Sequence, residues 1–402
     1  MTGAPLEGVR VLDFGQGVAG PYCGQLLADQ GAEVIKIEPA RGDWSRTMGV
    51  AGEDGQSAVF VSVNRGKRGI GLDLRQPEAL RLARGLASDC DVLIESFRPG
   101  VMDRLGLGRT DLRKAQPRLI YCSVTGFGPD GPNVDLPAGD STMQAYGGLM
   151  SIIGERDGEP LRVGNVVSDM LAGMNAFSGV LLALLRRKAG VPGSDVHVSL
   201  LDSIVAFQAP PLTEYLMTGH PPQRLGNEHP LIAPSGSMRT ADGAITFTVF
   251  DHQWRRFCES LGVEPLASDP RFATSAGRQR HRDELRGFLS PLFAAGTREQ
   301  WLGRLRAMDV LCAPINEYPE LVADPQVRHN GLIGDLGAGA TSYPSIRNPI
   351  RGIEGTSAPS APPRLGEHTR AVLRDACGLA AGEIQDLIDR GIVFAASEKL
   401  HA

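Results

Sequence analysis

The chain has 402 residues, of which 42% are apolar and 22% charged, and its formal net charge is −5. These values are typical of a globular protein with room for two or three domains. They exclude a general nucleic-acid binder, whose affinity would need a basic surface. No run approaches the roughly 20 apolar residues of a membrane span, and the N-terminal residues lack the apolar core of a signal peptide. We therefore expect a cytoplasmic protein that binds neither nucleic acid nor a membrane.

Residues 9–126 alternate short apolar runs with stretches of helical character. Strands are predicted at 9–14, 32–38, 69–74, 91–96 and 118–128, and helices at 21–31 and 76–88. Pro21 suits the first position of the first helix, and Gly31 suits its C-terminal cap. Strands that alternate with helices form βαβ units, so we predict an α/β domain with a parallel, doubly wound, Rossmann-like sheet.

The first predicted strand runs into a glycine-rich loop. Gly15, Gly17 and Gly20 have the spacing G-x-G-x-x-G, and Glu38 ends the second strand about 20 residues further on. In dinucleotide-binding proteins such glycines bring helix N-terminal amides close to a phosphate, and the acid binds a ribose. The same glycines also serve where a strand turns tightly into a helix. The loop alone leaves both interpretations open.

The amino-acid composition changes at residues 219–236, which are rich in Pro and Gly and indicate a domain boundary. Before this boundary we expect a long helix at 168–188, a strand at 195–200 and an apolar helix ending near Met217. After it we expect a hairpin at 237–250 turning at Asp242-Gly243, helices at 251–261, 281–295 and 297–309, and C-terminal helices near 367–378 and 381–391. The predicted organisation is a large domain at 1–218, a small α+β domain at 219–330, and a crossing segment at 331–402 whose helices return to the large domain.

The cysteines and histidines indicate no metal site and no disulfide framework. The six cysteines lie far apart without a C-x-x-C pair, and the eight histidines form no H-x-x-x-H motif. We expect reduced and mostly buried thiols.

Several longer stretches together resemble the class III CoA-transferase family (CaiB/BaiF-like proteins), which includes formyl-CoA transferase and crotonobetainyl-CoA:carnitine CoA-transferase. In chain order these are GVRVLDFGQGVAGPYCGQLLADQGAEVIKIEPARGD near the start, SVNRGKRGIGLDL (62–74), DVLIESFRPGVMDRLGLG (91–108), PRLIYCSVTGFGPDGP (117–132), LRVGNVVSDMLAGMNAFSGVLLALLRRKAGVPGSDVHVSLLDS (161–203), RLGNEHPLIAP (224–234), DPRFATSAGR (269–278) and LGEHTRAVL (365–373). The blocks are collinear over nearly the whole chain, which makes them far more specific than one glycine loop.

The resemblance implies an interlaced homodimer in which each chain forms a ring threaded through the other. It also implies a CoA-transferase of the EC 2.8.3 type that moves coenzyme A from a donor acyl-CoA to an acceptor carboxylic acid. Small dicarboxylic acids such as succinate are common donors in the family, but the sequence selects none. Coenzyme A would be a substrate, with no tightly bound cofactor.

In the stretch RVGNVVSDMLAG, an acid lies between an apolar run and an apolar helix. From the residues alone, Ser168 is the N-cap and Asp169 is a first-turn acid stabilised by the helix dipole. The family's transferases place their catalytic aspartate here, so the resemblance implies that Asp169 is the nucleophile of a relay through an aspartyl anhydride and an aspartyl-CoA thioester. We expect the helix terminus to keep Asp169 ionised, and Ala172 and Gly173 to leave room for substrate.

Asp140, in PAGDSTMQAYGG, matches a position where family members carry an acid facing the same site. The alternative is a loop acid that caps the next helix through Ser141. The family's 2-methylacyl-CoA racemases have a His just before this acid, and here that residue is Gly139. A two-base proton shuttle would lack one partner, so a transferase is favoured over a racemase. A nicotinamide-dependent oxidoreductase, or a CoA-binding protein without catalysis, are the remaining alternatives.

Coenzyme A needs cations for its phosphates. The match to the family and the charge pattern select Arg98 and the basic loop NRGKR with Arg65, Lys67 and Arg68. Arg41, which follows the stretch IEPA, is a further candidate. The loop NRGKR could equally be a solvated turn. In the glycine loop the resemblance selects three residues as CoA contacts, namely Gln16, Val18 and Ala19. The chain departs from the family at Pro39, where a basic residue is common, and at Val18, where some transferases carry Gln.

Overall fold

The computed structural model describes residues 3–52, 55–336, 342–353 and 360–396. The chain divides into two compact units. Unit 1 contains residues 1–149, 162–219 and 330–402, and unit 2 contains residues 150–161 and 220–329. The first and the last described segments of the chain therefore belong to the same unit. The short segment 150–161, which the sequence analysis did not assign to the smaller unit, lies in unit 2.

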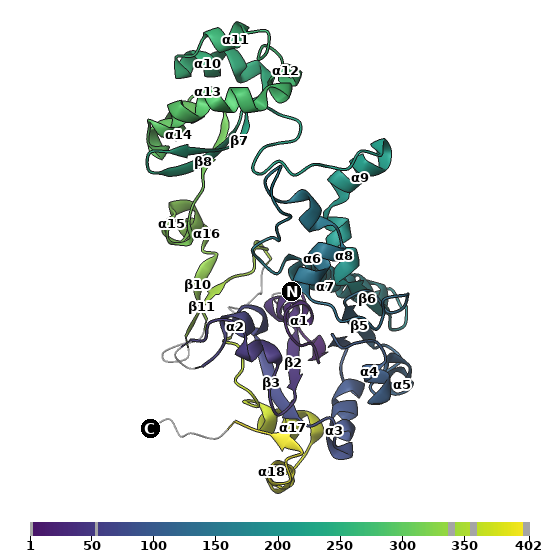
Figure 1. Ribbon diagram of the computed structural model, residues 1–402. Helices are drawn as coiled ribbons and strands as arrows, with labels where there is room; N and C mark the ends of the chain where they lie inside the picture. The colour runs from purple at the N-terminus through teal and green to yellow at the C-terminus, as the bar shows by residue number, and fades with distance from the viewer. Residues whose placement is uncertain (1–2, 53–54, 337–341, 354–359, 397–402) are drawn as a thin grey trace. The chain divides into compact units, whose positions relative to one another are not determined.

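Unit 1 is built on a seven-stranded sheet with the strand order β12-β3-β2-β1-β4-β5-β6 (Figure 1). Six strands are parallel: β1 (Arg10–Asp13), β2 (Glu33–Glu38), β3 (Lys67–Leu72), β4 (Val92–Glu95), β5 (Ile120–Thr125) and β6 (Asp195–Ser199). The chain adds β2 and β3 on one side of β1, and then β4 to β6 on the other side. In doubly wound sheets, ligands bind at the carboxyl ends of the strands where the order reverses, which here is between β1 and β4.

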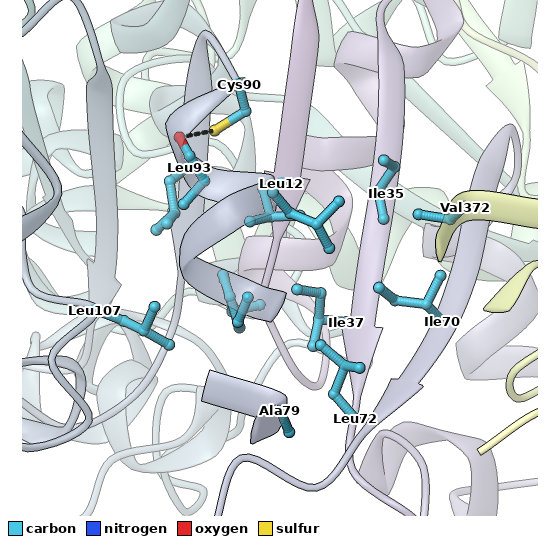
Figure 2. Packing of buried hydrophobic residues seen from close by; sticks show 14 of the residues in the cluster. Leu12, Ile35, Ile37, Ile70, Leu72, Ala79, Cys90, Leu93, Leu107 and Val372 are labelled. Carbon is cyan, nitrogen blue, oxygen red and sulfur yellow. Dashed lines mark hydrogen bonds between the residues drawn. The ribbon is translucent and has the colours of Figure 1, made fainter. Parts of the chain in front are cut away.

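Both faces of this sheet are covered, which explains why its strands have continuous apolar runs. Successive residues point to opposite faces, so Leu12, Ile35 and Ile37 enter one core, and Val11 and Val34 enter the other. Figure 2 shows the first core, in which Ile70 of β3 lies beside Val372 of the C-terminal helix α17 (Thr369–Cys377) and Leu72 lies beside Ile37. Helices α3 (Pro77–Ser88), α4 (Val101–Arg104), α5 (Arg109–Ala115) and α18 (Ala381–Asp389) complete this side.

The second core is formed by α1 (Ala19–Asp29) and α7 (Val167–Lys188). Gly173 of α7 allows the close approach, because a Cβ atom there would lie 2.8 Å from the Ala19 carbonyl oxygen and 2.9 Å from the Tyr22 ring. Helix α1 starts two residues earlier than predicted, so Pro21 is its third residue and not its first. A proline is tolerated there because the first helical amides need no partner within the helix. Gly31 follows the helix with φ of +93°, as its predicted cap role requires.

Helix α7 is long and apolar enough to cross a membrane by length and composition, with a mean hydropathy of 1.5. It is instead a core helix of unit 1, since its inner residues Ala172, Ala176 and Val180 are completely buried. It packs on α1, β5, β6 and α8 (Leu200–Phe207). Its last turn is basic, with Arg186, Arg187 and Lys188.

The C-terminal segment closes unit 1. After α17 and α18 the chain forms β12 (Val393–Phe394), which pairs antiparallel with β3 at the edge of the sheet. Thr369 donates a hydrogen bond to the Phe394 carbonyl oxygen and accepts one from the Gly71 amide. The other elements of unit 1 are the 3-10 helix η1 (Trp44–Thr47), α2 (Ala58–Asn64), α6 (Asp140–Tyr146), α9 (Ala209–Thr218), and the hairpin of β10 (Ile333–Leu336) and β11 (Tyr343–Ile346).

Unit 2 has a three-stranded antiparallel sheet in the order β7 (Ser235–Thr240), β8 (Gly243–Thr248) and β9 (Leu311–Pro314). Its core contains Phe247, Phe257 and Phe293, and the fully buried Arg278 lies over the Trp254 ring. The helical elements of this part of the chain are η2 (Leu149–Ile152), η3 (Asp251–Gln253), α10 (Trp254–Leu261), α11 (Pro265–Ser268), α12 (Ser275–Arg280), α13 (Arg282–Ala294), α14 (Arg298–Arg306), α15 (Tyr318–Ala323) and α16 (Pro325–Asn330).

The predicted parallel α/β sheet and the predicted hairpin are confirmed. The strands β9, β10, β11 and β12 were not predicted, and neither was α2. Each of these strands has at most four residues, which is too short for an alternating pattern to stand out. β9 and β12 form at the exposed edges of β8 and β3, whereas β10 and β11 pair only with each other. All six cysteines are free and four of them are buried, in agreement with the sequence.

Candidate active site

A cavity of about 1500 Å³ opens in unit 1 at the carboxyl ends of β1, β4 and β5. Its lining includes the residues after β1, the loop after β4, the region around α6, and the first turn of α7, and it also includes Leu332 and residues 346–349. The backbone amide of Gln16, in the loop after β1, donates a hydrogen bond to the hydroxyl of Ser96, which follows β4, at 2.9 Å. The cavity therefore lies at the point where the strand order reverses, as expected for a doubly wound sheet.

Asp169 is the third residue of α7 and lines this cavity. None of the described residues donates a hydrogen bond to its carboxylate. Burial, followed by the nearby charge of Asp140, raises the pKa of Asp169 to about 7. The expectation that the helix terminus keeps Asp169 ionised therefore does not hold near pH 7, where the protonated and ionised forms coexist. Desolvation of the carboxylate in the cavity wall disfavours its charged form, and the neighbouring charge of Asp140 adds to this effect.

The N-terminus of α7 is stabilised from another helix. Its N-cap residue, Val166, has no side chain to accept a hydrogen bond. Asp140, the first residue of α6, supplies the acceptor: its Oδ1 atom accepts from the Ser168 amide at 2.8 Å and from the Ser168 hydroxyl at 2.7 Å. Ser168 is thus the second helical residue and not the cap that the sequence predicted. Asp140 does not cap its own helix through Ser141 either, but it lines the cavity beside Asp169.

Ala172 and Gly173 do not open space for a substrate, contrary to the sequence-based expectation. Ala172 is completely buried, and the space beside Gly173 is occupied by the Ala19 carbonyl and the Tyr22 ring of α1. The small residues serve helix packing. They bring the start of α1, with Val18 and Ala19, next to the turn that carries Asp169.

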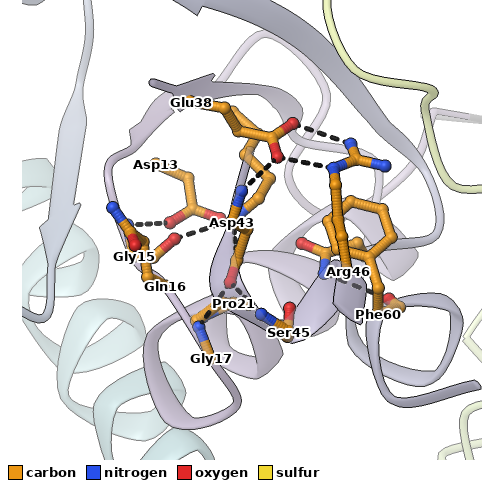
Figure 3. Close-up of polar contacts among 12 residues, drawn as sticks. Asp13, Gly15, Gln16, Gly17, Pro21, Glu38, Asp43, Ser45, Arg46 and Phe60 are labelled. Carbon is orange, nitrogen blue, oxygen red and sulfur yellow. Dashed lines mark hydrogen bonds and ion pairs between the residues drawn. The ribbon is translucent and has the colours of Figure 1, made fainter. Parts of the chain in front are cut away.

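The backbone amides of the glycine loop donate hydrogen bonds to side chains of the protein itself (Figure 3). The Gly15 amide donates to the Asp13 carboxylate at 2.8 Å, and the Gly17 amide donates to the Asp43 carboxylate at 2.9 Å. With the Gln16 amide bonded to Ser96, three successive amides have acceptors from the chain. The loop between β1 and α1 therefore does not present these groups to a phosphate. Gly17 is required for another reason, because its φ is +79° and a Cβ would overlap the Trp44 ring.

Two buried lysines hold the carboxylates that bind this loop. Lys36 forms an ion pair with Asp43 at 2.8 Å and donates to the Gly15 carbonyl oxygen. Lys67 contacts Asp13 at 2.8 Å, the Pro21 carbonyl oxygen at 2.7 Å and Asn64 at 2.8 Å. Burial lowers the pKa of Lys67 to about 8. Lys67 is 2% exposed and does not line the cavity, so it supports the loop and cannot reach CoA phosphates as the sequence suggested.

Glu38, the acid that completed the dinucleotide pattern, is also bound by groups of the chain itself. Arg46 contacts both of its oxygens at 2.7 and 2.8 Å, and the Asp43 amide donates to it at 2.9 Å (Figure 3). Glu38 is completely buried. A buried carboxylate with three donors has no place for a ribose, so the nicotinamide interpretation loses its acid as well as its amides.

Of the arginines predicted to bind CoA, Arg98 and Arg65 line the cavity, whereas Arg41 and Arg68 do not. Arg98 lines the cavity, as do Gln16, Val18 and Ala19. Arg41 is exposed outside the lining, and Arg68 forms ion pairs with Glu33 and Asp375. Arg65 does line the cavity, but both terminal nitrogens and its Nε already donate to Asp29 and the Ile346 carbonyl. Arg41 and Arg68 are therefore not brought to the cavity.

Two further arginines, Arg162 and Arg347, line the cavity and were missed. Within the part of the chain that the structure describes, no acceptor pairs with the guanidinium of Arg98, Arg162 or Arg347. Arg162 lies in a stretch that leads into the Asp169 helix, and this proximity was a signal. Arg347 follows Asp169 by 178 residues, and nothing local in the sequence distinguishes it from other arginines.

Comparison with known sequences decides the family. Residues 6–369 match the sequence model of CoA-transferase family III. The chain belongs to this family. It transfers CoA between acyl-CoA donors and carboxylic acid acceptors, and the nicotinamide interpretation of the glycine loop is wrong.

Relatives of this CoA-transferase cover almost its whole length. A succinate–glutarate CoA-transferase from Agrobacterium fabrum is 39% identical over 92% of this chain and 95% of the relative. A succinyl-CoA:glutarate CoA-transferase from Mus musculus is 34% identical over 97% of this chain and 90% of the relative. The crystal structure of a CAIB/BAIF family protein from Brucella suis has a TM-score of 0.86 at 35% identity, over 93% of this chain and 100% of that one.

Proposed function

We propose that this CoA-transferase exchanges coenzyme A between short dicarboxylic acids, with Asp169 as the nucleophile. The observation that carries the proposal is the cavity in which Asp169 lies together with three arginines that have no acceptor among the described residues. A free cation is needed for the distal carboxylate of a dicarboxylic acid, and the phosphates of CoA need others. The names of the relatives from A. fabrum and M. musculus, which act on succinate or its CoA ester and on glutarate, support this substrate class.

The reaction is a relay of four acyl transfers. The Asp169 carboxylate attacks the donor thioester carbonyl, which forms a mixed anhydride and releases CoA thiolate. The thiolate then attacks the aspartyl carbonyl, so the donor acid leaves and the enzyme carries CoA as an aspartyl thioester. The acceptor carboxylate attacks this thioester, which releases thiolate and forms a second anhydride. Attack of the thiolate on the acceptor's acyl carbonyl gives the new acyl-CoA and restores Asp169.

The elevated pKa of Asp169 has two opposite consequences for this chemistry. Only the ionised form attacks, so part of the enzyme is inactive at pH 7. The same desolvation makes the ionised carboxylate more basic than an exposed aspartate, and basicity favours attack on a thioester. Because each intermediate stores the energy of the donor thioester, the relay needs no ATP hydrolysis.

We also propose that the chain works as a homodimer joined through α7, α8 and α9. These helices carry eight exposed large apolar side chains: Met174, Leu182, Leu185, Phe207, Leu212, Tyr215, Leu216 and Met217. Patches of this kind on a globular protein mark association surfaces. The resemblance to the family suggests the partner, a second copy of the chain in an interlaced arrangement. Light scattering after size-exclusion chromatography tests it, and a monomeric mass at micromolar concentration would contradict it.

The central experiment is mass spectrometry of the peptide that contains Asp169. After succinyl-CoA is added, we expect a succinyl or CoA adduct on this peptide, and none with Asp169→Asn. Adding glutarate should discharge the adduct and give glutaryl-CoA, whereas butyrate, which lacks the second carboxylate, should discharge it at least about tenfold more slowly. Equal rates with glutarate and butyrate would contradict the dicarboxylate proposal. Deuterium uptake at the acyl α-carbon without an acceptor would instead indicate a racemase.

A further inference from the structure

Gln144 is a fully buried amide on α6. Its Nε2 atom donates to the Asp140 carboxylate at 2.7 Å and to the Asn165 carbonyl oxygen at 3.2 Å. Its Oε1 atom accepts from the Val163 amide at 2.8 Å. Both donors and the acceptor of the side chain are therefore in use. Of the side chains of similar size, only that of Gln can make two donor contacts and one acceptor contact here, since an ionised Glu has no donor and Leu has neither donor nor acceptor.

The three contacts lie around the segment that delivers the nucleophile. Asp140, held by Gln144 through Oδ2, uses its Oδ1 atom to bind the amide and hydroxyl of Ser168. Val163 and Asn165, held by the same side chain, are the residues that lead into α7. Because Val166 offers no cap of its own, the position of the first turn of α7 depends on these bonds from α6.

We propose that Gln144 is a positioning residue: by holding Asp140 and residues 163–165, it orients the first turn of α7 and aims Asp169 into the cavity. This inference rests on the proposed role of Asp169. Gln144 does not line the cavity and does not touch substrate. It acts through Asp140 and Ser168, and it keeps a charged group at a set position beside the nucleophile.

The charged surroundings of Asp169 allow this role to be measured. Asp140 on α6 is the acid whose charge acts on it. Helix α1, which packs on α7, presents Ala19 and the uncharged Tyr22 there, and Arg162 lies in the entering segment. An ionised Glu at position 144 would lack the two N–H donors of Gln144. Its negative charge would add to that of Asp140 beside Asp169. The acid limb of the kcat profile would then move to higher pH.

The experiment compares Gln144→Glu, Gln144→Leu and the control Gln76→Glu, which makes the same change at an exposed position before α3. We expect both Gln144 variants to lower kcat about 10- to 100-fold at pH 7 with less than a threefold change in KM. Gln144→Glu should also move the midpoint of the acid limb upward by about one pH unit. Gln76→Glu should do neither.

A double variant distinguishes positioning from general damage to the fold. Asp140→Asn combined with Gln144→Glu exchanges donor and acceptor: the new amide can donate to the new carboxylate and still accept from Ser168. We expect it to recover at least about tenfold of the kcat lost in Gln144→Glu and to return the midpoint toward its original value. Unchanged kcat and midpoint in Gln144→Glu, or no recovery in the double variant, would overturn the proposal.

A second measurement separates this inference from the proposed function. The difference in unfolding free energy between Asp169→Asn and the original protein, followed from pH 5 to 9, reports the titration of Asp169 without any turnover. In the Gln144→Glu background, the pH above which this difference becomes constant, which reports the pKa of Asp169 in the folded protein, should shift upward, and no shift would contradict the inference. If Asp169 forms no adduct with any acyl-CoA, the proposed nucleophile fails while this titration still tests Gln144.

Discussion

The glycine loop and the first turn of α7 present opposite relations between sequence and chemistry. The loop has a pattern associated with phosphate binding, yet Asp13, Asp43 and Ser96 accept hydrogen bonds from three of its amides. The first turn of α7 has no distinctive motif, yet it places at the cavity wall a carboxylate that receives no hydrogen bond from any described residue. Polar groups that the fold satisfies provide structure. Reactivity belongs to groups that the fold desolvates and leaves unpaired.

The largest expected effect is the loss of activity in Asp169→Asn. This change keeps the size of the side chain and removes the nucleophile, so we expect transfer to fall by at least about 10⁴-fold. The molecular mass in solution and the circular dichroism should not change. Chromatography of the acyl-CoA products measures the rate of CoA transfer. A rate in Asp169→Asn within tenfold of that of the original protein would refute the proposed mechanism.

The glycine loop should instead respond through stability. Lys67→Met leaves Asp13 as an uncompensated buried charge, and we expect a loss of about 3–5 kcal/mol of unfolding free energy. Arg75→Met is the matched control, because it removes the ion pair of an exposed arginine with Asp73 and should leave the unfolding free energy nearly unchanged. Urea unfolding measures both. If Lys67→Met unfolds at the same urea concentration as the original protein but has a tenfold higher KM for acyl-CoA, Lys67 binds CoA and does not only support the loop.

The pH dependence compares the two states of the nucleophile. The pKa of Asp169 is about 7, so kcat should fall nearly tenfold for each pH unit below 7 and level off above it. Stability should behave in the opposite sense. A carboxyl group whose pKa is raised in the folded protein stabilises the fold at low pH, and this contribution disappears as pH rises through 7. Asp169→Asn should therefore be more stable than the original protein at pH 8, by an amount that shrinks toward pH 5. Equal stability across this range would show that Asp169 is not desolvated.

The smallest expected effects concern the arginines. Arg98→Ala should raise the KM for acyl-CoA about 5- to 20-fold with little change in kcat, because it removes a charge-assisted contact at a solvated position. Arg41→Ala, which removes an exposed arginine outside the lining, should change KM less than about twofold. A larger effect of Arg41 than of Arg98 would reverse the assignment made from the cavity.

Local patterns were sufficient for the parallel sheet, the hairpin of unit 2 and the long helix that carries Asp169. Strand and helix periodicities are local properties, and each of these elements is long enough to show one. The first strand also shows how far such patterns reach. Its apolar residues predicted a buried strand, but the acid at its end, Asp13, gave no sign that it would bind Lys67, 54 residues later.

Within the site, the identity of Asp169 came from the collinear resemblance, and Arg98 and the residues of the glycine loop came with it. Arg347 and Gln144 could not be found in this way. Arg347 reaches the cavity from a segment 178 residues beyond Asp169, and Gln144 acquires its role from contacts with Asp140 and with residues 19 and 21 positions away.

The amino-acid sequence was enough to establish a parallel α/β protein of the CoA-transferase family with Asp169 as the candidate nucleophile. The folded structure was needed to show which polar groups remain available. Whether an amide, a lysine or a carboxylate is free depends on partners distant along the chain, as in the pairs of Gly17 with Asp43 and Lys67 with Asp13. The ionisation of Asp169 depends likewise on burial and on Asp140. Hydrogen bonding and desolvation are set by distances in space, and for these residues no local pattern in the sequence encodes them.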